Sequence, residues 1–236
     1  DTSEFRDPVG TFRTFNDFFT RHLLPGARPC DPAPEALCSP ADCRLLAFDD
    51  VTELTSFPVK GLEMTVADLL GQRGVDEESA AFRKGSLVLC RLAPSDYHRF
   101  HFPAAGRFDG ARWAGKRYDS VNPIALLHAP GILARNRRAV NRLKLDTFGD
   151  MRFVEIGAFG VARITHTFSG ERFRKMDEKG VFSFGGSTLV MLFRPRTLHL
   201  DADLVANTRN GYETRVLAGE TIGRKHPLSS HTERKR

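Results

Sequence analysis

The chain has 236 residues, of which 41% are hydrophobic, and carries a formal net charge of +6 at pH 7 with a pI near 9.4. This is enough for a buried core in one large or two small domains. The modest positive excess suits an anionic partner such as a phospholipid surface. No stretch reaches the roughly 18 apolar residues of a spanning helix, and no basic segment is interleaved with aromatic residues as in RNA-binding domains. The four cysteines lack the spacing of a zinc site, so no bound metal is expected and a reducing compartment is the default. No nucleic-acid partner is expected either.

Residues 11–24 carry apolar side chains at helical spacing, ending before Pro25-Gly26. This pattern predicts an amphipathic N-terminal helix. Its apolar face could pack on a core or lie in a membrane interface, and the sequence favours neither. The side chains that form the face are Phe12, Phe15, Phe18, Phe19 and Leu23.

Short helices and then strands are expected further along the chain. Thr65 and Asp68 form a capping box for a helix ending at Gly71, and a second short helix is expected over residues 77–83. Strand-like segments separated by Gly and Pro turns dominate afterwards. The pattern predicts one compact, β-rich α+β domain of mostly antiparallel strands over residues 1–223, with a basic, disordered tail at 224–236. The expected strands are 86–93, 106–118, 152–168, 189–193 and 213–222.

One cluster of basic residues lies outside the tail. A solvated helix face explains it at least as well as a ligand site does. Its members are Arg135, Arg137, Arg138, Arg142 and Lys144.

The stretch KGVFSFGGSTLVMLF places Gly185-Gly186-Ser187 between two strand-like runs. A Gly-Gly pair permits backbone angles that other residues avoid, and a strained glycine carbonyl can be attacked by the hydroxyl that follows it. On this motif alone, a simple hairpin turn is the plainer interpretation.

Two other segments supply groups for chemistry. His98 and His101 lie in LAPSDYHRFHFP, after a strand and before Pro103, with no third metal ligand in view. The turn SPAD supplies Asp42. Together Asp42, His101 and Ser187 provide the acid, base and hydroxyl of an activated serine. However, GGSTL lacks the GxSxG elbow of an ordinary hydrolase.

Ten segments together identify a family: FNDFFTRHLLPGARP, SPAD, VKG, LAPSDYHRFHFPAAG, VNPIA, NRRAV, VEIGAFGV, KG, FGGST and ETRVLAGETIG. Over nearly its whole length the chain resembles the phosphatidylserine decarboxylases, which are pyruvoyl-dependent enzymes. The combination of DYHRFH with FGGST is the most specific match and is closest to the GGST branch of the family.

The resemblance implies that the chain cuts itself between Gly186 and Ser187, giving a β chain of residues 1–186 and an α chain of residues 187–236. Ser187 Oγ would attack the Gly186 carbonyl, with His101 as the base and Asp42 orienting the imidazole. Elimination would leave a pyruvoyl group, derived from Ser187, on the new N-terminus.

The resemblance also implies the reaction. The pyruvoyl carbonyl would form a Schiff base with the substrate amine and accept electrons as CO₂ leaves, without a metal. His98 would be the acid that reprotonates the product, and Tyr97 is a weaker candidate for substrate contact. The expected partners are phosphatidylserine, a membrane surface with which the protein associates peripherally, the two cleaved chains and a second copy in a homodimer.

Three departures from the family pattern are Cys43, where a glycine is usual, Arg163 in place of a serine, and a shortened approach to the cleavage site before Gly185. All three leave Asp42, His101 and Ser187 in place. Two alternatives therefore stand beside phosphatidylserine decarboxylation. One is a pyruvoyl-dependent decarboxylase of a soluble amino acid such as tryptophan, and the other is a cleavage-dead, membrane-associated binding protein.

Overall fold

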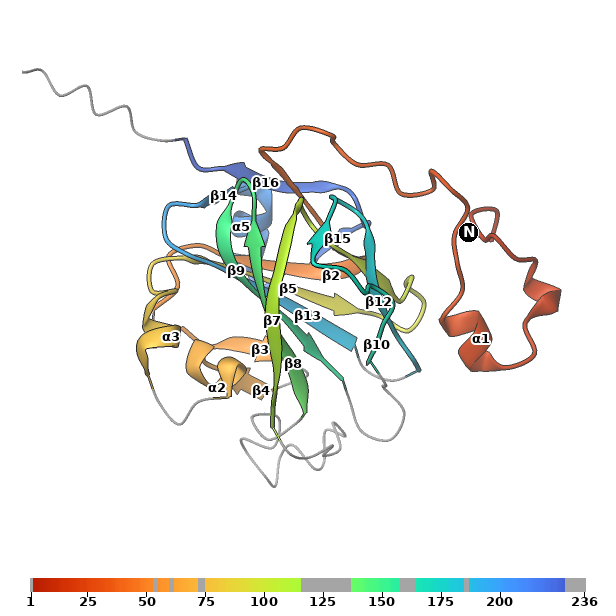
Figure 1. The fold of residues 1–236 in the computed structure, drawn as a ribbon, viewed down its shortest axis with the longest axis horizontal. Helices are drawn as coiled ribbons and strands as arrows, with labels where there is room; N and C mark the ends of the chain where they lie inside the picture. Colours follow the sequence, from red (N-terminus) through yellow and green to blue (C-terminus); the bar gives the residue numbers. More distant parts are fainter. Residues whose placement is uncertain are drawn as a thin grey trace, which may run out of the picture.

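The computed structural model describes residues 2–52, 55–59, 62–71, 75–115, 137–157, 164–184 and 187–227. Its centre is an eight-stranded sheet in the order β11-β7-β8-β9-β13-β5-β2-β15 (Figure 1). The strands of this sheet are β2 (Cys43–Phe48), β5 (Ser86–Leu92), β7 (Gly106–Ala114), β8 (Arg138–Leu145), β9 (Gly149–Ile156), β11 (Arg172–Phe173), β13 (Ser187–Phe193) and β15 (Thr214–Val216).

Smaller sheets and short helices surround this sheet. Two three-stranded sheets have the orders β1-β16-β14 and β10-β12-β6, and β3 pairs with β4. All pairings among the described strands are antiparallel, which confirms the predicted β-rich α+β class. The strands are β1 (Ala36–Cys38), β3 (Phe57–Val59), β4 (Leu62–Met64), β6 (Arg99–His101), β10 (Ile164–His166), β12 (Glu178–Phe182), β14 (Leu198–Leu200) and β16 (Thr221–Lys225). The helices are η1 (Val9–Thr11), α1 (Phe15–Phe19), α2 (Val66–Leu70), α3 (Glu77–Ala80) and α5 (Ala202–Arg209).

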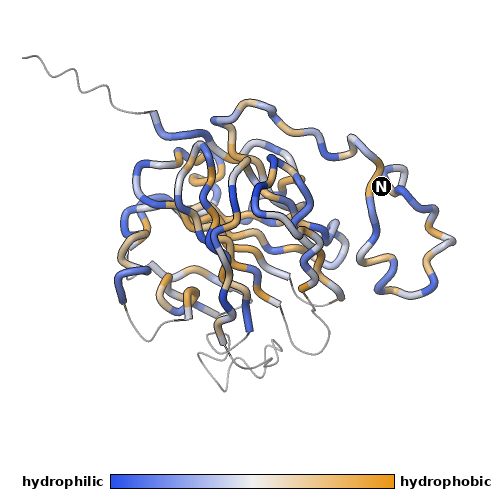
Figure 2. Tube along the Cα trace, in the orientation of Figure 1, coloured by the Kyte–Doolittle hydropathy of each residue, from blue (hydrophilic) through white to orange (hydrophobic). Residues whose placement is uncertain are grey.

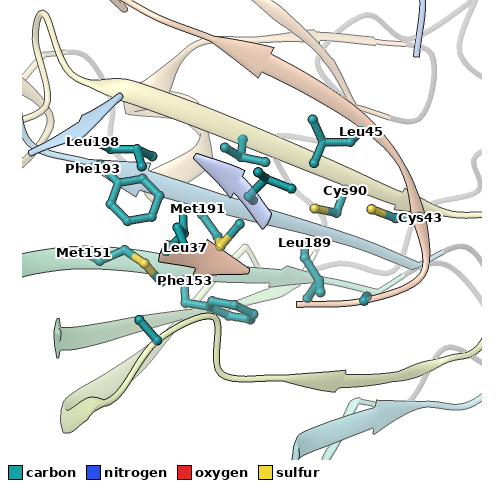
Figure 3. Close-up of a cluster of buried hydrophobic side chains, with 14 of the residues drawn as sticks. Leu37, Cys43, Leu45, Cys90, Met151, Phe153, Leu189, Met191, Phe193 and Leu198 are labelled. Carbon is teal, nitrogen blue, oxygen red and sulfur yellow. The ribbon is translucent and has the colours of Figure 1, made fainter. Parts of the chain in front are cut away.

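Strand β13 runs through the middle of the large sheet and is buried on both faces, which explains its unbroken apolar run (Figure 2). Because side chains alternate along a strand, Leu189 and Met191 enter one core cluster, whereas Val190 and Leu192 enter the other. The first cluster also contains Cys43, Cys90 and Phe193 (Figure 3). Ser187 lies at the start of β13, so it is held by the best-packed strand of the fold.

The N-terminal helix is much shorter than predicted. Thr14 and Asp17 form a capping box at the start of α1, and the helix ends at Phe19. After α1 the chain is extended, and Leu23 pairs with Phe5 in an isolated antiparallel β-bridge. The first 35 residues form an arm that extends beside the sheets (Figure 1).

The capping box of α2 is confirmed. Thr65 and Asp68 bond each other's backbone N–H groups, and Gly71 ends the helix with a φ of 77°. Helix α3 also confirms the second predicted helix, in a shorter form. Helix α5 was not predicted, because its sequence is mostly polar and buries only Leu204 and Val205.

The basic cluster does not lie on a helix. Arg138, Arg142 and Lys144 are on strand β8, whose first four residues are buried and whose last four alternate between exposed and buried. Arg138 is fully buried, and its Nε donates to the Leu69 carbonyl oxygen at 2.6 Å. Its Nη2 donates to the Asp68 carbonyl oxygen, so Arg138 satisfies the end of α2 rather than a ligand. Arg135 lies outside the described residues.

Strand β16 continues to Lys225, so regular structure extends two residues past the predicted domain end at 223. Lys225 N–H donates to the Glu35 carbonyl oxygen at 2.8 Å. Residues 228–236 of the predicted tail lie outside the described residues.

A buried ion pair joins the small β10-β12-β6 sheet to the large sheet. Lys179 of β12 and Glu155 of β9 are 3% and 0% exposed, and their side chains meet at 2.5 Å. Asn141 Oδ1 accepts from Lys179 Nζ at 3.2 Å, and His166 Nε2 lies 2.6 Å from the other Glu155 oxygen. Burial alone would raise the pKa of Glu155, but Lys179 and His166 lower it below its ordinary value.

We therefore expect Glu155→Leu to destabilise the protein by about 3–5 kcal/mol, because it leaves the Lys179 ammonium buried without a counter-charge. Glu155→Leu combined with Lys179→Met removes both charges and should cost much less. Urea unfolding in an uncleaved Ser187→Ala background measures both. Equal losses for the single and double variants would contradict a charge-pair role.

Candidate active site

The segment that contains Gly185 and Gly186 is not a hairpin turn. Strand β12 before it pairs with β6 and β10, whereas β13 after it pairs with β5 and β9, so the two strands belong to different sheets. The hairpin interpretation is wrong because a hairpin would pair β12 with β13 directly. Gly185, Gly186 and Arg163 lie outside the described residues.

Strands β12 and β13, on either side of this junction, pair with β6 and β5, which lie on either side of the histidine segment. Ser187 at the start of β13 lies opposite Leu92, the last residue of β5. Phe182 N–H at the end of β12 donates to the His98 carbonyl oxygen at 3.0 Å. The end of β12 and the start of β13 therefore lie beside the connection 93–98, which brings the predicted nucleophile and histidines into one region.

Ser187 is 1% exposed. It occupies the same face of β13 as Leu189, which is the face of the main core cluster. A hydroxyl in this position is shielded from bulk water, as a nucleophile must be if it is to attack the preceding peptide rather than be solvated.

His101 presents an unpartnered nitrogen. Its Nδ1 lies 3.1 Å from the Met176 carbonyl oxygen. Since a carbonyl only accepts, Nδ1 carries the hydrogen, and Nε2 holds a lone pair in the neutral ring. Nε2 is buried and has no hydrogen-bond partner among the described residues. Burial lowers the pKa of His101, so the ring is held in the neutral form that a general base requires.

His98 has the same pattern of hydrogen bonding. Its Nδ1 lies 2.9 Å from the Asp96 carbonyl oxygen, and its Nε2 is also buried without a described partner. The ring of Phe19 covers it, with ring centroids 3.6 Å apart. Burial lowers the pKa of His98 to about 4. His98 is therefore neutral at rest, and it can act as an acid only after it has first accepted a proton.

Asp42 lies within electrostatic range of both histidines but is held by another residue. Arg28 Nε donates to Asp42 Oδ1 at 2.8 Å and Arg28 Nη2 donates to Oδ2 at 2.6 Å, while Ala218 N–H donates to Oδ1 at 2.9 Å. Negative charge on Asp42 raises the pKa of His98 and His101, against the lowering by burial. The described contacts show the Met176 carbonyl, not Asp42, bonded to the His101 ring, so the orienting role of Asp42 stays a prediction.

The N-terminal arm covers the site. Phe184 N–H, two residues before Gly186, donates to Asn16 Oδ1 at 3.1 Å. The Phe184 ring packs edge-on against Phe15 at 4.8 Å and Phe19 at 5.4 Å. Arg21 is 6% exposed and donates to the carbonyl oxygens of Ser95 and Asp96, which precede the histidines.

Tyr97 is 6% exposed and stacks on His101, with ring centroids 6.0 Å apart. Burial raises the pKa of Tyr97, so its phenol stays protonated. Sequence reasoning missed Arg28, Arg99 and Glu178, which border the site. Arg28 lies within the matched segment FNDFFTRHLLPGARP, but only the fold shows that it meets Asp42.

Cys43 does not disturb the site. It begins strand β2, where no glycine is required, and its fully buried side chain packs beside Cys90 in the main core (Figure 3). No group of three His, Cys, Asp or Glu side chains in the described ranges could hold a metal ion. No helix in those ranges is long and apolar enough to span a bilayer.

These features fit a pyruvoyl group formed from Ser187. A buried serine begins the central strand, and the buried His98 and the half-buried His101 each leave a buried, bare Nε2. Unpartnered buried nitrogens are costly in a finished core, and they are expected where a proton must be taken up during a reaction.

Comparison with known proteins decides the family. The sequence profile described as phosphatidylserine decarboxylase matches residues 15–224. The chain is 41% identical to a phosphatidylserine decarboxylase proenzyme of Ruminiclostridium cellulolyticum over 94% of the chain and 74% of that protein. It is 41% identical to the proenzyme of Chlamydia pneumoniae over 94% and 73%. The chain belongs to the phosphatidylserine decarboxylase family.

Members of the phosphatidylserine decarboxylase family also include longer chains. Phosphatidylserine decarboxylase proenzyme 3 of Schizosaccharomyces pombe is 40% identical over 92% of this chain but only 22% of its own length. The profile match spans every predicted site residue, from Asp42 to Ser187. The word proenzyme in the relatives' names fits a chain that is processed.

Ser187→Ala and His101→Ala are each expected to leave one uncut chain, because the first removes the nucleophile and the second removes the expected base. Denaturing mass spectrometry of each purified variant measures this. The isosteric control Asp146→Asn, which changes an exposed carboxylate paired with Arg172, should still cleave. Normal cleavage of His101→Ala together with an uncut His98→Ala would show that the two histidine roles are exchanged.

Proposed function

We propose that the protein is a phosphatidylserine decarboxylase that converts phosphatidylserine to phosphatidylethanolamine and CO₂ after cutting itself between Gly186 and Ser187. The observation that carries this proposal is the pair of neutral histidines with buried, bare Nε2 atoms beside the strand that begins at Ser187. One histidine serves maturation and the other serves the reaction.

In maturation, His101 Nε2 takes the proton of Ser187 Oγ as the oxygen attacks the Gly186 carbonyl. The C–N bond breaks, and the imidazolium returns the proton to the departing Ser187 nitrogen, which leaves an ester. Loss of the Ser187 Cα proton then expels the Gly186 carboxylate. One water enters and one ammonia leaves, and the α chain then begins with a pyruvoyl group.

In catalysis, the pyruvoyl group supplies an electron sink for decarboxylation of an amine-bearing substrate. His98 is well suited to move the proton. The bare Nε2 of His98 can take up a proton released at the site, and its pKa, lowered by burial, means that it holds that proton only weakly. The imidazolium so formed, with a pKa lowered to about 4 by burial, readily gives that proton back to the carbon from which CO₂ has left.

A lipid substrate is supported by apolar side chains on the arm that remain in solvent. Phe15 of α1 is 56% exposed and Phe184 of the cleavage segment is 42% exposed, and their rings touch. Val9 and Leu24 of the arm are also exposed. Aromatic side chains of this kind suit a membrane interface. We propose peripheral membrane association through this surface; the homodimer stays a prediction.

His98→Ala is expected to leave self-cleavage intact and to lower decarboxylation by about 10²–10⁴-fold, the usual loss for a proton-transfer group. The assay measures CO₂ from phosphatidylserine in mixed vesicles, with the short chain quantified on a denaturing gel. Release of CO₂ from free tryptophan and none from the lipid would instead favour the soluble substrate. A cleaved wild-type chain that releases CO₂ from neither would contradict both.

A further inference from the structure

Glu178 of β12 lies directly opposite His101 of β6 in the antiparallel pair. Backbone hydrogen bonds hold the strands together at this point: Phe102 N–H donates to Asp177 O at 3.0 Å, and Met176 N–H donates to Phe102 O at 2.8 Å. Directly opposed residues have Cβ atoms about 5 Å apart. The Glu178 carboxylate is therefore a fixed neighbour of the His101 imidazole.

One oxygen of this carboxylate is held and the other is available. Glu178 Oε1 accepts from Arg99 Nη1 at 2.8 Å and from Thr167 Oγ1 at 2.8 Å. Oε2 has no hydrogen-bond partner in the part of the chain that the structure describes. Asp42 differs, because Arg28 and Ala218 occupy both of its oxygens.

The charged and titratable groups that face His101 come from three elements. Arg99 lies on its own strand and Glu178 on the neighbouring one, while Asp42, with its partner Arg28, precedes β2. The Tyr97 ring stacks on the imidazole. Burial lowers the pKa of His101; Glu178 raises it more than Asp42 does, and Arg99 lowers it.

We propose that Glu178 is a positioning residue for self-cleavage: its carboxylate, fixed by Arg99 and Thr167, stabilises the imidazolium that His101 becomes when it takes the Ser187 proton. This inference rests on the proposed function, because it concerns the maturation step. Glu178 would act together with Asp42, because both carboxylates raise the pKa of His101. Asp42 also anchors Arg28, and with it the arm.

Arg99 links this charge balance to the arm. Its Nε donates to the carbonyl oxygens of Thr20 at 3.1 Å and Arg21 at 3.2 Å, directly after α1. The same guanidinium thus holds the arm in place and offsets the Glu178 charge. Removing Arg99 and removing Glu178 should consequently move the basicity of His101 in opposite directions.

The test follows cleavage of freshly translated chain in buffers from about pH 5 to 9, with the short chain as the readout. The rate of the wild type should rise with pH as His101 loses its proton. Glu178→Gln keeps the size of the side chain and can still accept from Arg99 and Thr167. It should move the midpoint to lower pH and reduce the limiting rate about tenfold, less than loss of the base itself.

Arg99→Gln should move the midpoint to higher pH, and the double variant should return it toward the wild type. Asp146→Asn, which removes an exposed carboxylate paired with Arg172, is the matched control and should not move it. A Glu178→Gln midpoint equal to that of the wild type, or shifted upward, would overturn the inference. If the wild type itself fails to cleave at any pH, the proposed function has failed instead.

Discussion

The site depends on one constraint, the burial of two Nε2 atoms in imidazole rings whose Nδ1 atoms are hydrogen-bonded to backbone carbonyl oxygens. Each carbonyl fixes the tautomer, and burial keeps the ring neutral, so Nε2 of both His98 and His101 is a bare lone pair in a dry region. Such atoms cost stability unless the site uses them. Burial of apolar side chains in the large sheet offsets this loss of stability, because β13, which begins at Ser187, is buried along its whole length between two core clusters.

The N-terminal arm is the second part of the arrangement. It places Phe19 on His98, Asn16 on the backbone before the cleavage site, and Arg28 on Asp42. The arm also carries the exposed Phe15, which touches Phe184. A segment that covers His98 and also presents apolar side chains to solvent suits the proposed association with a membrane surface.

Much of this could be predicted from the sequence. Strands β5, β7 and β15 of the large sheet, most of β13 and part of β9 lie in segments expected to be strands, and α2 follows from the Thr65–Asp68 box. The candidate residues follow from DYHRFH, SPAD and GGST. Three features could not be predicted. The hairpin interpretation failed because strand partners are set by long-range packing. The basic cluster was interpreted as a helix face because the spacing of charges alone does not reveal the backbone carbonyl groups that Arg138 satisfies. Glu178 was missed because only the β6–β12 register places it opposite His101.

The most direct test is the intact mass of the purified chain under denaturing conditions. The account predicts two species, residues 1–186 and residues 187–236, with the shorter one lighter than a serine-initiated fragment by one ammonia and blocked to N-terminal sequencing. A single species at the full 26.4 kDa, persisting after incubation at neutral pH, would contradict self-cleavage and with it the pyruvoyl chemistry.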